Sequence, residues 1–376
     1  MENQIPPPLP PQTTSTQPPI FVTAAPPRRG GRGWMVLSLV LLGIIGLIMM
    51  GRMASFITGG GKHITGTQSG RYFEEITVES PEAGDKIVVV PVEGMITSSP
   101  WDPSGRSMVD AIEDQLKLAA KDPKVKAIIL KVDSPGGEVL ASDDISRAII
   151  QFQEKNQKPV IASMGGLAAS GGYYVSAPCD YIIANELTLT GSIGVIMSTF
   201  NYRGLMDKVG LKPTVFKSGK FKDMLRGSKT PDEIDPAEEK IIQDMIMDTY
   251  AKFKSVVKNG RERASGKNKS NGKTLVANWE EYADGRILTG KTAYELGFVD
   301  KLGNFQTALD TARQLSGISG KAHVIRYQEP FTLSKLFGMG ASSKVRKSEA
   351  VKIDLGLDIP ELKAGRPYFL SPTVMP

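Results

Sequence analysis

The chain has 376 residues, of which 40% are apolar and 23% are charged. These proportions are near those of globular proteins, and they exclude a wholly disordered, collagenous or many-span membrane chain. The formal net charge of +6 is a small excess spread over the whole sequence, whereas nucleic-acid-binding domains usually concentrate basic residues on one face. The sequence therefore predicts a globular catalytic or binding part and no nucleic-acid partner.

A single cysteine and two histidines limit the available chemistry. Cys179 alone cannot form an internal disulfide or a cysteine-rich metal site. We expect it to be a small buried residue, although a nucleophilic role with His323 is an alternative. Ser-His-Asp hydrolysis, Cys-His hydrolysis and a histidine-rich metal centre would each have to use His63 or His323. We expect no metal and no cofactor.

The composition of residues 1–51 predicts a disordered arm followed by a membrane span. Residues 1–33 are rich in proline and poor in residues that could pack, so we expect a disordered arm. Its P-x-x-P pattern at Pro7–Pro10 could alternatively dock a partner. Residues 34–51 are almost wholly apolar and long enough to cross a hydrocarbon core of about 30 Å, which predicts a single transmembrane helix that contacts lipid. A cleavable signal peptide is the alternative, but such peptides begin close to the N-terminus.

The charges that flank this span predict its orientation. Arg28, Arg29 and Arg32 precede it and Arg52 and Lys62 follow it, a modest bias that places the short arm in the cytoplasm. The rest of the chain would then lie outside the cytoplasm, on the periplasmic side of an inner membrane. Residues 52–84 are rich in glycine, threonine and serine, which predicts a juxtamembrane linker.

Residues 85–328 alternate between the patterns of strands and helices, which predicts stacked β-α units in an α/β fold. The expected strands are residues 87–92, 126–132, 160–164, 180–184, 193–197 and 213–217. The expected helices are residues 108–120, a segment around residues 145–152, and residues 236–261. Residues 329–376 form a basic, partly apolar C-terminal tail.

A serine and two glycines follow predicted buried strands. Ser170 in A-A-S-G-G would lie at a sharp strand-to-helix turn, where small neighbours let a substrate backbone approach. The pattern is not G-x-S-x-G, because Ala168 occupies the first glycine position, so a small-residue packing turn is the alternative. Gly136 and Gly137 in D-S-P-G-G could direct backbone amides at an oxyanion, or could form an ordinary turn.

An activated serine needs a base, and neither histidine is well placed to be one. His63 lies in the linker and His323 in an apolar stretch that favours a structural role. A neutral lysine is the remaining option, which requires its pKa to fall from about 10.4 towards 7 through burial or nearby positive charge. The lysines of F-K-S-G-K-F-K-D are candidates, and spacing does not choose among them: Lys217, Lys220 and Lys222.

Five motifs together resemble the signal peptide peptidase A family, in its short bacterial form, over about residues 85–315. They are K-A-I-I-L-K-V-D-S-P-G-G, M-G-G-L-A-A-S-G-G, L-T-G-S-I-G-V, K-S-G-K-F-K-D and G-R-I-L-T-G-K-T-A-Y-E-L-G-F-V-D. The resemblance implies a ClpP/crotonase-like fold and a serine peptidase of family S49 with a Ser-Lys dyad. It makes Ser170 the nucleophile, Lys222 the base, Ser192 the residue that hydrogen-bonds the lysine, and Gly137 an oxyanion donor. The amide of Gly171 is expected as the second donor from the turn geometry.

The resemblance also implies a membrane-seated homo-oligomeric ring, an octamer in the best-described case, in which serine and lysine can come from neighbouring subunits. The implied substrates are remnant signal peptides and other apolar peptides. Two other functions are open at this point. One is a crotonase-like acyl-CoA hydratase or isomerase, which would use the oxyanion hole without a serine nucleophile, and the other is a non-catalytic membrane scaffold.

Overall fold

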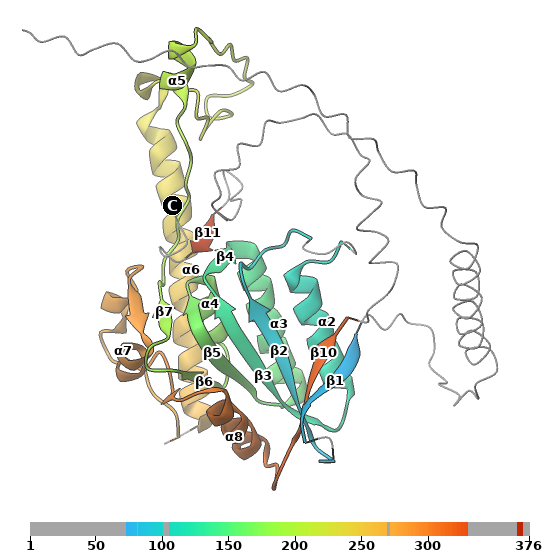
Figure 1. Ribbon diagram of the computed structural model, residues 1–376. Helices are drawn as coiled ribbons and strands as arrows, with labels where there is room; N and C mark the ends of the chain where they lie inside the picture. The colour runs from blue at the N-terminus through green and yellow to red at the C-terminus, as the bar shows by residue number, and fades with distance from the viewer. Residues whose placement is uncertain (1–72, 81, 101–104, 269–270, 330–366, 371–376) are drawn as a thin grey trace, which may run out of the picture. The chain divides into compact units, whose positions relative to one another are not determined.

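The computed structural model describes residues 73–80, 82–100, 105–268, 271–329 and 367–370 (Figure 1). The predicted arm of residues 1–33 and the predicted span of residues 34–51 lie outside these ranges. Within the described residues, no helix combines the length and the apolar character needed to cross a membrane.

A nine-stranded sheet forms the centre of the described part, with the order β1-β10-β2-β3-β5-β6-β9 and with β7 pairing to β5 and to β8. All its pairings are parallel except β1 with β10 and β7 with β8. Two further strands, β4 and β11, pair with each other. The strands are β1 (Glu74–Glu79), β2 (Lys86–Glu93), β3 (Val125–Ser134), β4 (Gly136–Glu138), β5 (Val160–Ala169), β6 (Tyr181–Ala184), β7 (Leu189–Gly191), β8 (Ile287–Thr289), β9 (Lys301–Leu302), β10 (His323–Gln328) and β11 (Tyr368–Leu370).

Helices cover both faces of this sheet. They are α2 (Met108–Lys121), α3 (Val139–Asn156), α4 (Gly171–Ser176), α5 (Arg203–Lys208), α6 (Pro236–Asn268), α7 (Gly290–Glu295) and α8 (Phe305–Ser316), with short 3-10 turns at Pro231–Glu233 and Trp279–Tyr282. Strands buried on both faces need apolar side chains at successive positions, which is why β2, β3 and β5 are rich in valine, isoleucine and leucine.

Alternate residues of these strands enter two separate cores. Val88 and Val90 belong to the larger core, which also contains apolar residues of α2, α3, α4 and α6. Ile87 and Val89 point the other way and pack with Ala308, Leu309 and other residues of α8. The predicted class of stacked β-α units is therefore confirmed.

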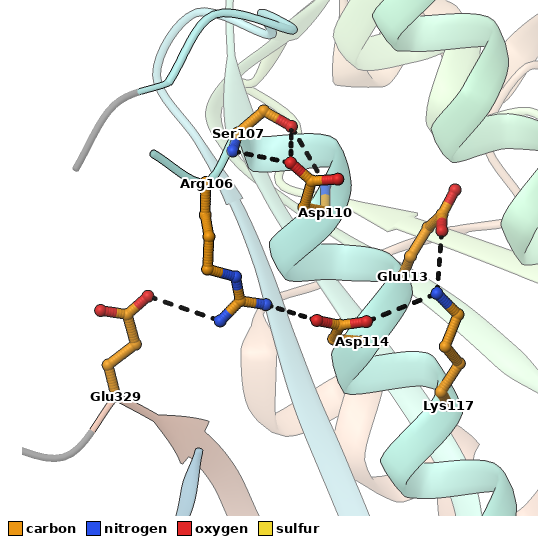
Figure 2. Close-up of polar contacts among 7 residues, drawn as sticks. All are labelled: Arg106, Ser107, Asp110, Glu113, Asp114, Lys117 and Glu329. Atoms are coloured by element: carbon orange, nitrogen blue, oxygen red, sulfur yellow. Dashed lines mark hydrogen bonds and ion pairs between the residues drawn. The ribbon is translucent and has the colours of Figure 1, made fainter. Parts of the chain in front are cut away.

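Polar contacts at the start of α2 fix the position of this helix (Figure 2). Ser107 and Asp110 form a capping box, in which the Asp110 amide donates to Ser107 Oγ at 3.2 Å and the Ser107 amide to Asp110 Oδ2 at 3.0 Å. Arg106 contacts Asp114 at 2.6 Å and Glu329, beside the end of β10, at 3.8 Å. These contacts join α2 to the neighbouring strand.

The long helix α6 packs through its second half. A Cβ on Gly260 would lie only 2.4 Å from the carbonyl oxygen of Ala177, so glycine lets α6 approach the end of α4 closely. Arg261 and Asp300 form an ion pair in which both side chains are fully buried, and Asp300 also accepts the amide of Ile182 in β6 at 2.8 Å. These contacts fix α6 behind the turn that carries Ser170.

Two of the predicted strands and several of the predicted boundaries differ from the structure. Residues 193–197 make only an isolated bridge at Ile196, and residues 213–217 are not a strand. Both segments have the apolar pattern of a strand, but residues 193–197 pair with β11 at Ile196 alone, and no described strand pairs with residues 213–217. The predicted linker, residues 52–84, contains β1, and the predicted tail contains β11, because each finds a partner strand. Helix α6 runs seven residues beyond Arg261, to Asn268.

Candidate active site

Ser170 lies in the turn between β5 and α4, in a conformation that side chains rarely adopt. Its φ of 54° and ψ of −116° belong to none of the common regions, and such strained residues concentrate at functional sites. The residue is fully buried, and its Oγ has no hydrogen-bond partner in the described chain. A buried hydroxyl without a partner is costly, so this one is available for a group that the isolated chain does not supply.

The glycines predicted as oxyanion donors lie beside this serine. A Cβ on Gly171 would be 3.0 Å from the amide nitrogen of Gly137, and a Cβ on Gly137 would be 1.9 Å from the carbonyl oxygen of Ile96. Any larger residue would clash with backbone at both positions, so only glycine lets the two chain segments come this close. The amides of Gly137 and Gly171 are thus brought to one side of the Ser170 turn.

Ser192 directly follows strand β7, just as Ser170 directly follows the neighbouring strand β5. β7 pairs with the end of β5, and the amide of Ser170 donates to the carbonyl of Gly191 at 2.8 Å. Ser192 follows directly, is 3% exposed, and has a φ of 50°. Its amide donates to the carbonyl of Arg286 at 2.8 Å. The structure therefore places Ser170, Ser192, Gly137 and Gly171 together.

The candidate lysines differ in their partners. Lys217 Nζ contacts Asp223 Oδ1 at 2.9 Å, and Lys220 Nζ is paired with Asp235. A carboxylate partner stabilises the protonated amine, which opposes the role of a neutral base. Lys222 has no hydrogen bond or ion pair through its side chain within the described residues. The structure thus distinguishes among lysines that spacing alone left equivalent.

A fourth lysine, Lys229, is buried beside two carboxylates. Its Nζ lies 2.7 Å from Glu238 Oε1 and 3.3 Å from Asp223 Oδ1. Burial alone would lower the pKa of Lys229, but the hydrogen bonds and charges of Glu238 and Asp223 outweigh it and raise the pKa above its ordinary value. Lys229 is therefore a charged structural residue.

Lys222 is not brought to the serine within one chain. Its side chain is exposed, and no hydrogen bond in the described chain joins it to Ser170. His323 is also remote from the site, since its ring contacts Thr77 Oγ1 at 2.9 Å across the β1-β10 pair, and His63 lies outside the described residues. One chain thus assembles four of the five predicted site residues and leaves the fifth in solvent.

The sequence did not reveal a peptide strand at this site. Strand β11 pairs antiparallel with β4, so that Phe369 lies opposite Gly137 and Leu370 opposite Gly136. On its other side, Tyr368 bridges to Ile196. The only sequence signal was a short apolar triplet, Y-F-L, in a tail otherwise rich in basic and small residues. An extended segment therefore lies against the strand that carries the candidate oxyanion donor.

A buried serine at a strand-to-helix turn, backbone amides beside it and an extended peptide along its edge define a serine hydrolase suited to peptides. Residues 152–319 match the family described as "Peptidase family S49". A putative signal peptide peptidase SppA of Enterococcus faecium is 34% identical over 80% of this chain and 83% of its own length. A putative protease of Synechocystis is 38% identical over 62% of this chain and 75% of its own length.

Two further likenesses are more distant. Protease 4 of Salmonella typhi is 32% identical over 75% of this chain and 43% of its own length. A solved membrane-bound stomatin-specific protease aligns with 66% of this chain and all of its own, at 17% identity and a TM-score of 0.41, a likeness too weak to define the fold. The sequence matches suffice for the assignment: the chain belongs to peptidase family S49, among the SppA peptidases, and is a serine peptidase.

Proposed function

We propose that this protein is a membrane-anchored endopeptidase with a Ser170-Lys222 dyad, which cleaves remnant signal peptides and other apolar peptides. The observation that carries the proposal is the Ser170 hydroxyl, which is fully buried, strained at its backbone and without a hydrogen-bond partner. In this scheme Ser170 Oγ attacks a peptide carbonyl, and neutral Lys222 takes the hydroxyl proton and returns it to the leaving amine. The amides of Gly137 and Gly171 hold the oxyanion, and Ser192 orients the lysine amine.

The exposed position of Lys222 supports a dyad completed by a second copy. The segment that carries it has apolar side chains in solvent, including Phe200 at 83% and Phe216 at 95% exposure. Exposed apolar groups of this density mark an interaction surface. A neighbouring copy that covers them would also remove Lys222 from water, and burial of this kind lowers the pKa of a lysine. A closed ring of identical subunits satisfies both requirements.

The apolar composition of residues 34–51 supports the anchor. A span of this length fixes the peptidase to the inner membrane, with residues 1–33 in the cytoplasm and the catalytic part on the periplasmic side. Released signal peptides remain close to the bilayer because they are apolar, so an anchored peptidase meets them there. Extraction of membranes at high pH should leave the full-length protein in the membrane pellet.

The dyad is tested with alanine variants and an active-site probe. Ser170→Ala and Lys222→Ala should each lower peptidase activity by at least about 1,000-fold, while the matched variant Lys220→Ala should stay within about threefold of wild type. A fluorophosphonate probe should label wild type and lose its target in Ser170→Ala. Labelling of wild type should rise with pH through the pKa of the base, and this titration should disappear in Lys222→Ala. Full activity in either dyad variant would reject the assignment.

A further inference from the structure

Ile96 holds one edge of the strand that carries the candidate oxyanion donor. Its amide donates to the carbonyl of Gly136 at 2.8 Å, and its carbonyl accepts the amide of Glu138 at 2.8 Å. These bonds make a parallel bridge between Ile96 and Gly137. Because the backbone groups of successive residues in a strand face opposite edges, the amide of Gly137 is turned away from Ile96. It faces the edge where β11 pairs, beside Gly171.

The contact between Ile96 and Gly137 is close enough to transmit small displacements. Ile96 is fully buried, and a Cβ on Gly137 would be 1.9 Å from its carbonyl oxygen and 2.7 Å from its amide nitrogen. The bridge is isolated, so Ile96 is not fixed by a strand of its own. The direction of the Gly137 amide therefore depends on what holds Ile96 in place.

The side chain of Glu138 binds the two residues that follow Ile96. Its Oε2 accepts the amide of Ser98 at 3.0 Å and also the hydroxyl of Ser98. Its Oε1 accepts the hydroxyl of Thr97 at 3.3 Å. Glu138 thus holds this segment twice, through its backbone amide on Ile96 and through its carboxylate on Thr97 and Ser98.

The carboxylate of Glu138 serves this contact rather than the helix that follows it. Glu138 is the N-cap of α3, but its side chain makes no capping hydrogen bond, and glutamate is not among the preferred N-cap residues. The residue is only 7% exposed, and burial of a carboxylate is costly unless hydrogen bonds compensate for the lost water. The donors of Thr97 and Ser98 supply that compensation, so this side chain is suited to fixing the segment that begins at Ile96.

We propose that Glu138 is a positioning residue for the oxyanion hole: its carboxylate fixes the segment that begins at Ile96, and Ile96 fixes the direction of the Gly137 amide. This inference rests on the proposed function, in which Gly137 donates to the oxyanion. Loss of the contact would weaken binding of the transition state more than binding of the substrate. A direct electrostatic effect of Glu138 has the opposite sign, because a negative charge next to Gly137 disfavours an oxyanion.

Kinetics of Glu138→Gln on a Leu-Leu-Leu aminocoumarin peptide test this role, because glutamine keeps the size of the side chain but places a donor where the carboxylate has only acceptors. We expect kcat to fall about 10- to 100-fold, with KM within about twofold of wild type, since complete loss of one oxyanion donor costs about 100- to 1,000-fold in kcat. The Ki of the matching Leu-Leu-Leu aldehyde, whose tetrahedral adduct with Ser170 needs the same amides, should rise as kcat/KM falls. Glu154→Gln, an exposed change near the other end of α3, should match wild type.

Ser98→Ala tests the same contact even if Glu138→Gln fails to fold, because Ser98 is exposed and loses only its hydroxyl. Alone it should lower kcat about three- to tenfold, and in the Glu138→Gln background by less than about twofold, since both changes act through one contact. Unchanged or higher kcat in either folded variant, additive effects, or a rise in KM alone overturns this inference and leaves the proposed function standing. Absence of fluorophosphonate labelling at Ser170 in wild type overturns the proposed function itself.

Discussion

Two regions of the molecule differ in how their apolar side chains are covered. In the sheet and its packed helices, β2, β3 and β5 bury apolar residues on both faces. Between Ile193 and Phe253, by contrast, no apolar residue is buried, and the only buried side chains belong to Ser228, Lys229 and Glu238. The sheet and its packed helices, the covered region, have their core within one chain. Residues 194–252, the uncovered region, lack a core of their own.

The two regions also divide the proposed dyad. Ser170 lies in the covered region and is fully buried, while Lys222 lies in the uncovered region and is exposed. A neutral lysine needs an apolar, water-poor environment, and the isolated chain does not provide one there. This difference supports a dyad in which assembly of several copies, rather than folding of one chain, brings Lys222 to Ser170.

The largest expected effect is recovery of activity from two inactive variants. Co-expressed Ser170→Ala and Lys222→Ala subunits should form mixed rings in which about a quarter of the junctions pair an intact serine with an intact lysine. Peptidase activity should then rise from background to about a quarter of wild type. If mixed assemblies of both variants stay inactive, serine and lysine come from the same subunit, and the comparison between the two regions loses its functional meaning.

The next largest effect should come from a charge introduced into the uncovered region. Phe216→Asp changes a side chain that is 95% exposed in the single chain, so it should leave the thermal unfolding of the monomer almost unchanged. In an assembly the same carboxylate would be buried without a partner. We expect loss of the oligomer in analytical ultracentrifugation and at least a tenfold loss of activity.

Leu187→Asp is the matched control, because Leu187 is 78% exposed and lies outside residues 194–252. It should sediment and cleave as wild type does. Equal dissociation in both variants would show that assembly does not depend on the uncovered region in particular.

The buried ion pair of the uncovered region should have an effect on stability alone. The side chains of Lys229 and Glu238 are 6% and 4% exposed. Glu238→Gln removes the nearer of the two carboxylates beside Lys229 and leaves Asp223, at 3.3 Å, as its remaining charged partner. The cost should therefore be below the about 3–5 kcal/mol that is typical when a buried pair is broken completely. Hydrogen exchange should therefore speed up around residues 228–240 and stay unchanged in β2 and β3. A uniform increase throughout the chain would mean that the two regions unfold as one unit.

The covered region is also the one that the sequence predicts well. The strands at residues 87–92, 126–132 and 160–164 and the helix at residues 108–120 are confirmed within a few residues, because runs of buried β-branched residues and a capping pattern are local signals. The alternation of Ile76 and Val78 would have indicated β1. Residues 213–217 show the converse: an apolar pattern there predicted a strand, but Phe216 faces solvent and no strand among the described residues pairs with this segment.

The candidate site divides in the same way. The turn of Ser170 and the glycines follow from small residues at strand ends, which spacing reveals. The family resemblance proposes Lys222 as the base, and the fold adds that Lys217 and Lys220 pair with Asp223 and Asp235, which their spacing in the sequence does not reveal. The occupation of the β4 edge by Phe369 joins residues more than 200 positions apart, and no local pattern carries that information.

The smallest expected effect concerns the turn that holds Ser192, in the covered region. Hydrogen bonding from Arg286 lowers the pKa of Asp284 from 3.8 to about 2, and the carbonyl of Arg286 accepts the amide of Ser192. Since the folded state favours the ionised carboxyl, this contribution is complete above pH 3.8 and is lost as the pH falls through 3.8 towards 2. Asp284→Asn should lower the urea midpoint slightly at pH 7 and not at all well below pH 2, where the carboxyl is protonated in the folded state as well. The effect should be small because both side chains are about half exposed and solvent screens their attraction. A difference that persists well below pH 2 would assign the role to packing rather than to charge.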